Sequence, residues 1–419
     1  MLLQNVRIYT GNQTGKGCGA GFRPGSIEIT GDRIAAIWYD DEQQPPMYCP
    51  PYAQQVIDGR GGYAIPGMID LHFHGCGGDD VCDLAEQEED SVTAMWQRIA
   101  EYQASIGVTG MAPALMTLPA EALKKTLTHA AAFAKSQQAG NAGGALLNGI
   151  NMEGPFISHA RCGAQDASFL LPCEEGLLQQ FLDAAEGLVK IVGIAPEKTG
   201  ALSMIRKVTN QVKISLAHTD ADYETAKLAL EAGACHITHL FNAMPPLHHR
   251  APGVVGAALE AVAEGRELMA ELICDGIHVH PAMIRAAFTL FGAEHIVLIS
   301  DSMRAAGMPD GEYLLGGQLV KVQGRRAELK KDGALAGSVT SLPDCVRIAV
   351  GEAGIPLKQA IACATINPAK VLGIAKEQGS IEAGKRADLV LWNEELEQQM
   401  VICGGKIIEG SGKCVDSKR

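Results

Sequence analysis

The stretch Asp70-Leu71-His72-Phe73-His74 ends the first long apolar segment in the middle of the chain. Similar short apolar segments follow it, and they alternate with segments of helical character, which is the pattern of parallel β/α architecture. We predict strands near 64–72, 108–115, 146–153, 189–196, 212–218, 235–241, 269–275 and 295–301. Four more of these strands end, like the first, on a residue type that binds a divalent metal or moves a proton: Glu153, His218, His239 and Asp301.

Eight strands of this kind predict an α/β fold, a (β/α)8 TIM-like barrel. The segments are largely apolar, as expected for strands that are buried on both faces. The alternative is an open doubly wound sheet, which would need a Gly-rich phosphate loop after its first strand. The chain has a His-x-His sequence there instead, and this favours the barrel. All strand ends of a barrel open onto one face, which carries the active site. We therefore expect the five strand ends to converge.

Both ends of the chain have a different character, with short strands around turns. An alternating strand, a Gly-Asp turn and a second strand occupy residues 25–37, and two similar strands lie in 384–392 and 400–408. We predict one small β-sandwich domain formed by residues 1–62 and 375–419 together, and a barrel domain at 63–374. Residues 338–373 are predicted to add a helical region after the eighth strand.

The composition of the 419-residue chain narrows its class. It is 47% hydrophobic and 20% charged, as is typical of an ordinary soluble enzyme. Its net charge of −13 argues against nucleic acid and anionic membranes as partners. The 12 cysteines form no Cys-x-x-Cys pair, which predicts reduced thiols in a cytoplasmic protein. We find no signal peptide, and no apolar run approaches the ~20 residues of a membrane span.

The strand-end residues are the candidate metal ligands. His72 and His74 point the same way from a strand because side chains alternate with period two, so two imidazoles side by side can bind one metal. The alternative is a pair of solvated or core histidines. Glu153 is followed by Gly-Pro after an apolar strand, and it is either a ligand or an ion-pair partner. His218 and His239 end consecutive strands, and imidazole suits zinc, iron and other first-row metals.

Asp301 and a second group of residues indicate what such a metal would do. Asp301 is either a helix N-cap or the acceptor of a proton from a metal-activated water. Arg250 follows the sixth strand and is a natural partner for a phosphate or carboxylate, unless it is an ordinary surface arginine. His278 follows the seventh strand and can polarise a carbonyl, and on spacing alone His280 can do so equally well. The whole set predicts a metal-dependent hydrolase.

Several motifs resemble a known family. They look like those of the N-acetylglucosamine-6-phosphate deacetylases of the amidohydrolase superfamily, and the resemblance covers essentially the whole chain. The motifs are Pro66-Gly67-Met68-Ile69-Asp70-Leu71-His72, Met152-Glu153-Gly154-Pro155, His239-Leu240-Phe241-Asn242-Ala243-Met244, Asp275-Gly276-Ile277-His278 and Leu335-Ala336-Gly337-Ser338. The segments Asn367-Pro368-Ala369-Lys370 and Gly384-Lys385-Arg386-Ala387-Asp388-Leu389 are similar to the superfamily's return into its small β domain.

The resemblance implies specific roles. One essential divalent metal is held by Glu153, His218 and His239, with Asp301 as general base and then general acid, and His278 as the residue that polarises the acetamide carbonyl. The sugar phosphate is met by Asn242, Ala243 and Arg250, and the sugar pocket is lined by Ala164, Leu335, Ala336 and Gly337. Many members have a histidine where this chain has Gln165, which can hydrogen-bond a sugar but cannot titrate.

The resemblance also implies the cofactor, the product and the assembly. His72 and His74 leave room for a second metal, so we expect one or two ions per chain, with zinc first and iron, manganese, cobalt or nickel as alternatives. The expected reaction converts N-acetyl-D-glucosamine 6-phosphate to D-glucosamine 6-phosphate and acetate, in a homodimer. The alternatives are the galactosamine epimer, another amidohydrolase and an inactive scaffold paralogue. Cyclic-amide hydrolases commonly bridge two metals with a modified lysine on strand four, and here Lys198 lies just beyond that strand.

Overall fold

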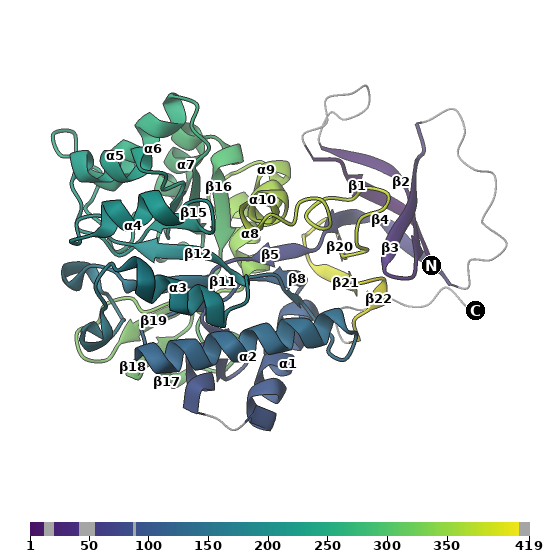
Figure 1. Cartoon of the computed structure of the whole chain (residues 1–419). Coiled ribbons are helices and arrows are strands. Elements are labelled where there is room, and N and C mark those ends of the chain that lie inside the picture. Colours follow the sequence, from purple (N-terminus) through teal and green to yellow (C-terminus); the bar gives the residue numbers. More distant parts are fainter. Residues whose placement is uncertain (12–20, 42–54, 87–88, 410–419) are drawn as a thin grey trace.

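The fold has two parts that differ in their secondary structure. We describe a computed structural model, which covers residues 1–11, 21–41, 55–86 and 89–409. Helices surround a parallel sheet in the larger part, and a small β-rich part, built from strands near both ends of the chain, lies beside it (Figure 1). The predicted α/β barrel with a small β unit formed by both termini is therefore confirmed in outline. Three of the twelve cysteines (Cys18, Cys49 and Cys414) lie outside the described residues, and the other nine are free thiols.

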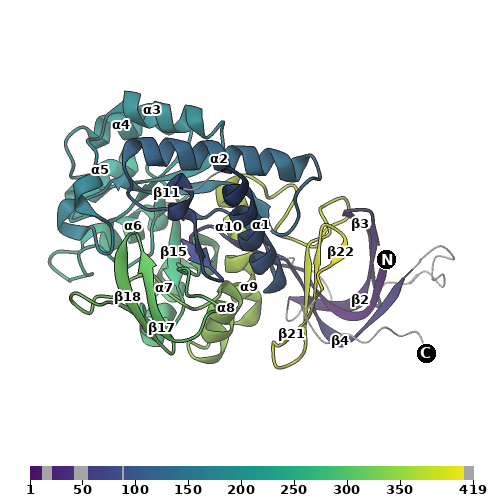
Figure 2. The ribbon, with the colours of Figure 1, turned by 90° about the horizontal axis from the view of Figure 1, so that it is seen from below.

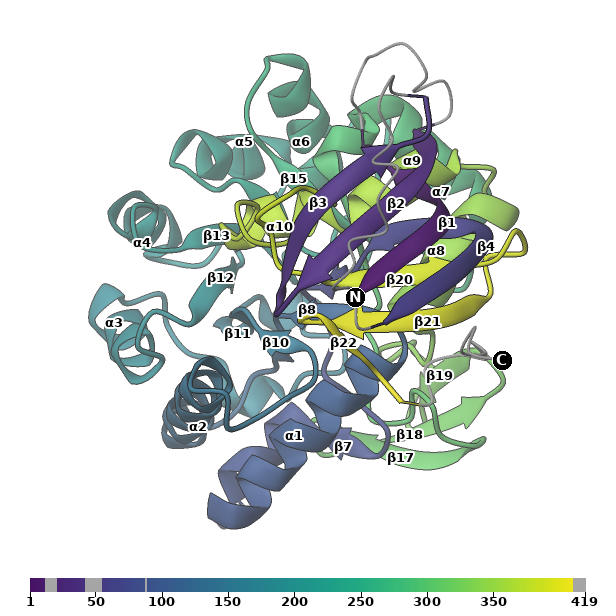
Figure 3. The ribbon, with the colours of Figure 1, turned by 90° about the vertical axis from the view of Figure 1, so that its right-hand side faces the viewer.

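The small β-rich part is one mixed sheet of seven strands, and both chain ends contribute to it. Its order is β22-β21-β20-β4-β1-β2-β3. The strands are β1 (Leu2–Tyr9), β2 (Phe22–Thr30), β3 (Arg33–Tyr39), β4 (Val56–Pro66), β20 (Leu389–Trp392), β21 (Gln398–Cys403) and β22 (Lys406–Ile407). The expected Gly-Asp turn joins β2 to β3, and Gly31 accommodates its φ of 60°. Figure 2 shows the sheet curved, and Figure 3 shows β20 between the N-terminal strand β4 and β21.

The junction between the two parts is strand β4. Its residues pair with β1 from Val56 onward and with β20 up to Pro66. One strand thus runs through the predicted boundary at residue 62, and the chain turns directly from Pro66 into the first barrel strand. The division into 1–62 with 375–419 and 63–374 stays a prediction, because a continuous strand gives no natural break at that position.

The barrel strands form two hydrogen-bonded groups. One has the order β16-β15-β14-β13-β12-β11-β9, and the other has the order β10-β8-β5. The strands are β5 (Met68–Asp70), β8 (Val108–Met111), β9 (Ala114–Leu115), β10 (Leu146–Leu147), β11 (Ile150–Phe156), β12 (Val189–Ile194), β13 (Lys213–Leu216), β14 (His236–Ile237), β15 (Met269–Ile273) and β16 (Ile296–Ile299). All pairings within these groups are parallel, and β8, β11 and β16 are buried throughout.

Single hydrogen bonds join the first strand to the last just beyond their ends. The Asp301 N–H donates to the His72 carbonyl at 2.9 Å, and the His74 N–H donates to the Ser302 carbonyl at 2.7 Å. Below them the Ser300 hydroxyl donates to a carboxylate oxygen of the buried Asp70. These bonds bring the two strand ends that carry His72, His74 and Asp301 side by side.

Helices cover the outside of the barrel strands (Figure 1). They are α1 (Glu89–Ser105), α2 (Ala120–Gln138), α3 (Glu175–Ala184), α4 (Ala201–Val208), α5 (Tyr223–Glu231), α6 (Gly253–Ala263), α7 (Pro281–Phe291), α8 (Leu342–Gly351), α9 (Leu357–Ala364) and α10 (Ile366–Leu372). The last three confirm the helical region expected at 338–373. Among the described residues, none of the helices is both long enough and apolar enough to cross a membrane.

A three-stranded antiparallel sheet between the eighth barrel strand and α8 was not predicted. It consists of β17 (Gly311–Leu315), β18 (Gln318–Gln323) and β19 (Arg326–Leu329). Its sequence carries the usual signals of hairpins, with alternating apolar residues and turns at Gly316-Gly317 and Gly324-Arg325. The amide of Gln318 donates to the Ala164 carbonyl, so this sheet is tied to the loop that follows β11. It thereby becomes one wall of the cavity at the strand ends.

Candidate metal centre and active-site pocket

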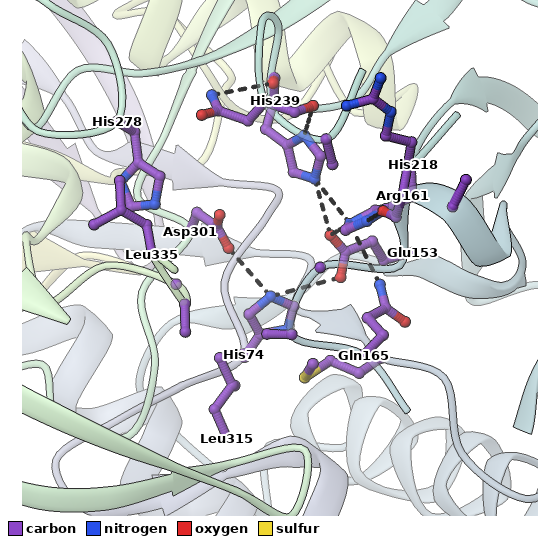
Figure 4. A pocket seen from close by; sticks show the side chains of 18 residues that line it. His74, Glu153, Arg161, Gln165, His218, His239, His278, Asp301, Leu315 and Leu335 are labelled. Atoms are coloured by element: carbon purple, nitrogen blue, oxygen red, sulfur yellow. Dashed lines mark hydrogen bonds and ion pairs between the residues drawn. The ribbon is translucent and has the colours of Figure 1, made fainter. Parts of the chain in front are cut away.

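The predicted strand-end residues converge in the folded chain (Figure 4). Glu153 lies within β11, and the other candidates come just after the strands that carry them. Three of them have left-handed backbone: φ is 43° at His218, 29° at His239 and 47° at Asp301. Such conformations cost about 1–3 kcal/mol each for residues other than glycine and are concentrated at functional sites. At these strand ends they turn the side chains toward a common centre.

Glu153 is that centre. Its Oε1 lies 2.9 Å from His218 Nε2 and 3.1 Å from His239 Nε2. His72 Nε2 lies 3.5 Å from the same oxygen, and His74 Nε2 lies 3.6 Å from Oε2. Asp301 Oδ1 stands 3.1 Å from His74 Nε2 on the other side. Four imidazoles and two carboxylates thus face one another in a buried space.

The tautomers of the four histidines follow from the partners of their other ring nitrogen. His218 Nδ1 is 2.8 Å from the Arg161 carbonyl, His239 Nδ1 is 3.2 Å from the Asn242 carbonyl, and His74 Nδ1 is 3.0 Å from the Ala114 carbonyl. A carbonyl oxygen only accepts, so each Nδ1 carries the hydrogen, and in the neutral ring each Nε2 has a lone pair. His72 Nδ1 likewise faces a carboxylate oxygen of Glu271 at 2.8 Å.

This donor set fits a divalent cation. Lone pairs of Nε2 atoms point at one another, and His218 Nε2 is only 3.1 Å from His239 Nε2, an arrangement that neutral rings alone do not favour. Within the part of the chain that the structure describes, His72 Nε2 and Asp301 Oδ1 are buried without a hydrogen-bond partner. Two ligand groups share Glu153: one with His72 and His74, and one with His218 and His239. Imidazole and carboxylate ligands suit zinc and related ions, and Glu153 can serve two of them.

The charges of the two carboxylates depend on these histidines. Burial alone raises the pKa of Glu153, but the charge and hydrogen bond of His218, with the hydrogen bonds of His239 and His72, lower it by more, so its net pKa lies well below the usual range. Burial also raises the pKa of Asp301, and the nearby His74 and His72 reverse this, so its net pKa is lowered. Both side chains are therefore ionised at neutral pH, as a cation site requires.

His278 faces the pocket, and a buried carboxylate orients it. Its Nδ1 lies 2.7 Å from Asp275 Oδ2, while Asp275 Oδ1 accepts the backbone N–H groups of Ile277 and His278, each at 2.8 Å. Burial lowers the pKa of His278, but the hydrogen bond and charge of Asp275 raise it more, so the net pKa lies above the usual value. His280 is exposed and accepts the Ala282 N–H as the N-cap of α7, outside the pocket. Sequence spacing did not distinguish His278 from His280 as the residue that polarises a carbonyl, and in the structure only His278 faces the pocket.

A cavity of about 310 Å³ opens above these residues. Its lining includes most of the predicted site residues: His74, Glu153, Ala164, Gln165, His218, His239, Asn242, Ala243, His278, Asp301, Leu335, Ala336 and Gly337. His72 is buried behind them. Arg250 is exposed beside His249 Nε2, which is 2.8 Å from its Nη1, and it is not part of the lining. Lys198 donates to the Ile157 carbonyl at 3.1 Å and is likewise absent from the lining.

Several lining residues were missed by the sequence reasoning. They are Met116, Ala160, Arg161, Gly163 and Leu315. The hairpin signals described above could have located Leu315. Arg161 lies in the loop after β11, close to Glu153 in the sequence, and its guanidinium pairs with Asp220 at 2.7 Å. Asp275 also went unrecognised, although its position three residues before His278 is the spacing of a short turn.

Gln165, predicted as a sugar contact, lies against the candidate metal ligand His218. Its Oε1 accepts the Thr117 N–H at 2.7 Å and also the Thr117 hydroxyl, which fixes the amide orientation. Its Nε2 is then turned toward His218 Nε2 at a distance of 3.4 Å. A histidine at position 165 could take up a proton and so place a positive charge beside His218, whereas the Gln165 amide stays neutral.

Comparison with known proteins agrees with this geometry. The model of the amidohydrolase family matches residues 63–408 of this chain. The N-acetylglucosamine-6-phosphate deacetylase of Bacillus subtilis (strain 168) is 35% identical over 408 residues, which cover 97% of this chain and 96% of that protein. The N-acetylgalactosamine-6-phosphate deacetylase of Escherichia coli O157:H7 is 36% identical over 343 residues, covering 82% of this chain and 86% of that protein.

A solved structure extends the comparison to the fold. A variant of N-acetyl-D-glucosamine-6-phosphate deacetylase from Mycobacterium smegmatis, in complex with N-acetyl-D-glucosamine-6-phosphate, has a TM-score of 0.84 and 33% identity, and the match covers 97% of this chain and 99% of that one. The chain described here therefore belongs to the amidohydrolase family. Within that family it belongs with the N-acetylglucosamine-6-phosphate deacetylases, as the sequence motifs indicated.

Proposed function

We propose that this protein hydrolyses the acetamide of N-acetyl-D-glucosamine 6-phosphate, giving D-glucosamine 6-phosphate and acetate. One observation carries the proposal: the Nε2 atoms of four histidines surround Glu153 at the floor of a cavity that also contains Asp301 and His278. Family membership and relatives that carry this activity support the choice of reaction.

The proposal assigns a divalent cation to Glu153, His218 and His239, with a second position at His72 and His74. A cation held there lowers the pKa of a water molecule and polarises a carbonyl oxygen. We propose zinc as the resident ion, because each position offers two imidazoles and the Glu153 carboxylate, and two imidazoles with one carboxylate form a typical catalytic zinc ligand set. Iron, manganese, cobalt and nickel accept the same ligands and are the alternatives in an elemental analysis.

Asp301 is the proposed proton carrier. Its carboxylate is buried and ionised and lines the cavity, so it is placed to take the proton of the attacking water. The same carboxyl group then gives the proton to the leaving amine, which completes hydrolysis of the amide. The short contact to His74 holds Oδ1 on the side of the cavity where the cation ligands lie.

His278 is the proposed partner of the acetamide oxygen. Because Nδ1 donates to the Asp275 carboxylate, only the protonated ring has a second N–H, at Nε2, to offer a substrate oxygen. The raised pKa of His278 favours this protonated form. A charged donor at this position stabilises the negative charge that develops on the oxygen during attack.

Recognition of the sugar phosphate is assigned to residues around the cavity mouth. Asn242 and Ala243 line it, and they keep their proposed role toward the phosphate. Arg250 remains a proposed phosphate contact, although its exposed side chain would have to turn to reach the cavity. Arg161 already lines the cavity and is a second candidate for the same anion. The proposed sugar contacts are Ala164, Gln165, Leu335, Ala336 and Gly337.

A second candidate substrate is the galactosamine epimer, because one relative with 36% identity is an N-acetylgalactosamine-6-phosphate deacetylase. A test is acetate release from N-acetylglucosamine and N-acetylgalactosamine, each with and without a 6-phosphate. The proposal expects the highest kcat/KM for N-acetylglucosamine 6-phosphate. No acetate from any of the four by the cation-loaded protein would refute the deacetylase assignment, and a preference for the galactose series would select the second candidate.

We also propose a homodimer in the cytoplasm. The nine described cysteines are free thiols, which agrees with a reducing compartment. The mass of one chain is 44.2 kDa, so sedimentation separates a monomer from a dimer clearly.

A further inference from the structure

Glu271 is a buried carboxylate beneath the cavity, and neither the motifs nor the proposed mechanism gives it a role. It lies on β15, and it is fully buried within the barrel. Burying a carboxylate is costly unless it is hydrogen-bonded and paired. Its partners are therefore the guide to what it does.

The partners of Glu271 belong to both halves of the metal centre. Oε2 lies 2.8 Å from His72 Nδ1, and it also accepts the backbone N–H of His239 at 3.0 Å. Oε1 accepts from the amide of Asn151 at 3.3 Å and lies 3.8 Å from His236 Nδ1. One carboxylate oxygen thus joins a ligand of the first group, His72, to a ligand of the second group, His239.

His72 differs from the other three histidines through this contact. His74, His218 and His239 donate their Nδ1 hydrogens to neutral backbone carbonyls, whereas His72 donates to a charged carboxylate. A carboxylate in this position fixes the tautomer and makes the opposite ring nitrogen a stronger ligand. That nitrogen, His72 Nε2, is buried and has no hydrogen-bond partner among the described residues, as expected for an atom that binds a cation.

The contact with His239 acts on the backbone. His239 has a φ of 29°, outside the ordinary regions for a residue with a side chain, and the N–H bond to Glu271 stabilises it there. The next residue reinforces the register, because the Leu240 N–H donates to the Glu271 carbonyl at 2.8 Å. The orientation of His239 and that of His72 therefore depend on the same side chain.

We propose that Glu271 is a positioning residue that orients His72 and His239 and strengthens cation binding at the position formed by His72 and His74. It touches neither cation nor substrate, and it acts through the two histidines. This inference rests on the cation site of the proposed function, but not on the identity of the substrate.

The test uses E271Q, which keeps the size of the side chain and its acceptor for both N–H groups while removing the charge. Purified full-length protein is loaded with zinc, and bound zinc is measured against increasing chelator. Loss of an outer carboxylate partner typically costs about 10- to 100-fold in metal affinity. We expect E271Q to lose its second zinc at a chelator concentration lower by about that factor, with the first zinc much less affected.

A charge-relocation variant distinguishes positioning from general structural damage. Asn151 Nδ2 lies 3.5 Å from His72 Nδ1, so N151D in the E271Q background returns a carboxylate to the same ring nitrogen. The double variant N151D/E271Q is expected to recover most of the zinc affinity. D388N is the matched control, because Asp388 is also buried but lies just before β20 of the small sheet, beside Arg386. Its chelator curve is expected to match that of the unmodified protein.

The outcomes separate this inference from the proposed function. An E271Q curve equal to that of the unmodified protein overturns the inference, and so does a folded double variant that binds no better than E271Q. If E271Q does not fold, the double variant decides alone: native-like zinc binding supports the inference and weak binding overturns it. If the unmodified protein binds one zinc that H72A does not affect, the inference fails and the proposed function stands. If it binds none, the proposed function itself fails.

Discussion

Replacing Asp301 with asparagine separates proton transfer from cation binding. Asparagine keeps the size of the side chain and, like aspartate, tolerates the left-handed backbone observed here (φ 47°), whereas alanine would add strain. General acid–base catalysis contributes about 10²–10⁴-fold, and here one group serves both proton transfers, so we expect a loss in kcat near 10⁴-fold. That factor corresponds to a barrier higher by about 5 kcal/mol.

The assay for this variant compares two quantities in one preparation. Acetate release is measured at saturating N-acetylglucosamine 6-phosphate, and zinc content is measured on the same sample. The carboxylate is not among the residues assigned to the primary cation, so we expect zinc to be retained. D310N, an exposed change of the same chemistry, is the matched control and should behave as the unmodified protein. Near-normal turnover in D301N would refute Asp301 as proton carrier, and joint loss of zinc and activity would make it a ligand first.

Three further predictions address the cation, the phosphate and the oxyanion. H218A should lose tightly bound zinc by elemental analysis while keeping its fold by circular dichroism, and retention of full zinc content would contradict the ligand assignment. R161A and R250A should be compared, because loss of a charged hydrogen bond costs about 1.5–3 kcal/mol. Whichever arginine binds phosphate should show kcat/KM lowered by about 10- to 100-fold for the phosphorylated sugar only, and equal losses on both sugars would exclude it. If catalysis needs protonated His278, activity should fall as the pH rises through the raised pKa of His278. D275N should move this fall in activity to lower pH, because burial then lowers the pKa of His278 without the opposing carboxylate. A fall at an unchanged pH would show that His278 does not act as a charged donor.

The strand-end residues could be predicted because barrel geometry brings them together whatever the exact bounds of the strands and loops. Parallel strands joined by helices place every carboxyl end on one face, so a histidine or carboxylate at such an end reaches that face. Glu153, His218, His239 and Asp301 follow this rule. The imidazoles of His218 and His239 meet the Glu153 carboxylate, and Asp301 lies beside His74 in the same space. The resemblance to the family then supplied the proposed roles, which no periodicity gives.

The sequence was less informative where a contact depends on the turn of a loop. His278 and His280 are equivalent by spacing, yet one lines the cavity and the other caps α7. Arg250 was predicted to contact the sugar phosphate, but its side chain is exposed and does not line the cavity. Arg161, from another loop, does line it. Loop side chains are directed by local dihedral angles and hydrogen bonds, and neither follows from residue type alone.

By itself, then, the sequence determined the alternation of barrel strands and helices, the histidines and carboxylates at the strand ends that could hold a metal, and the family. These features follow from the spacing of apolar residues within each segment and from the order of the segments along the chain. Only the tertiary structure decided which atoms meet: His72 and Glu271 are 199 residues apart in the chain, and their 2.8 Å contact depends on the register of the closed barrel. That contact, with the backbone carbonyls that fix the other three imidazoles, decides which ring nitrogen has its lone pair free. The chemistry of the site is set there, because a cation binds lone pairs and not residue types.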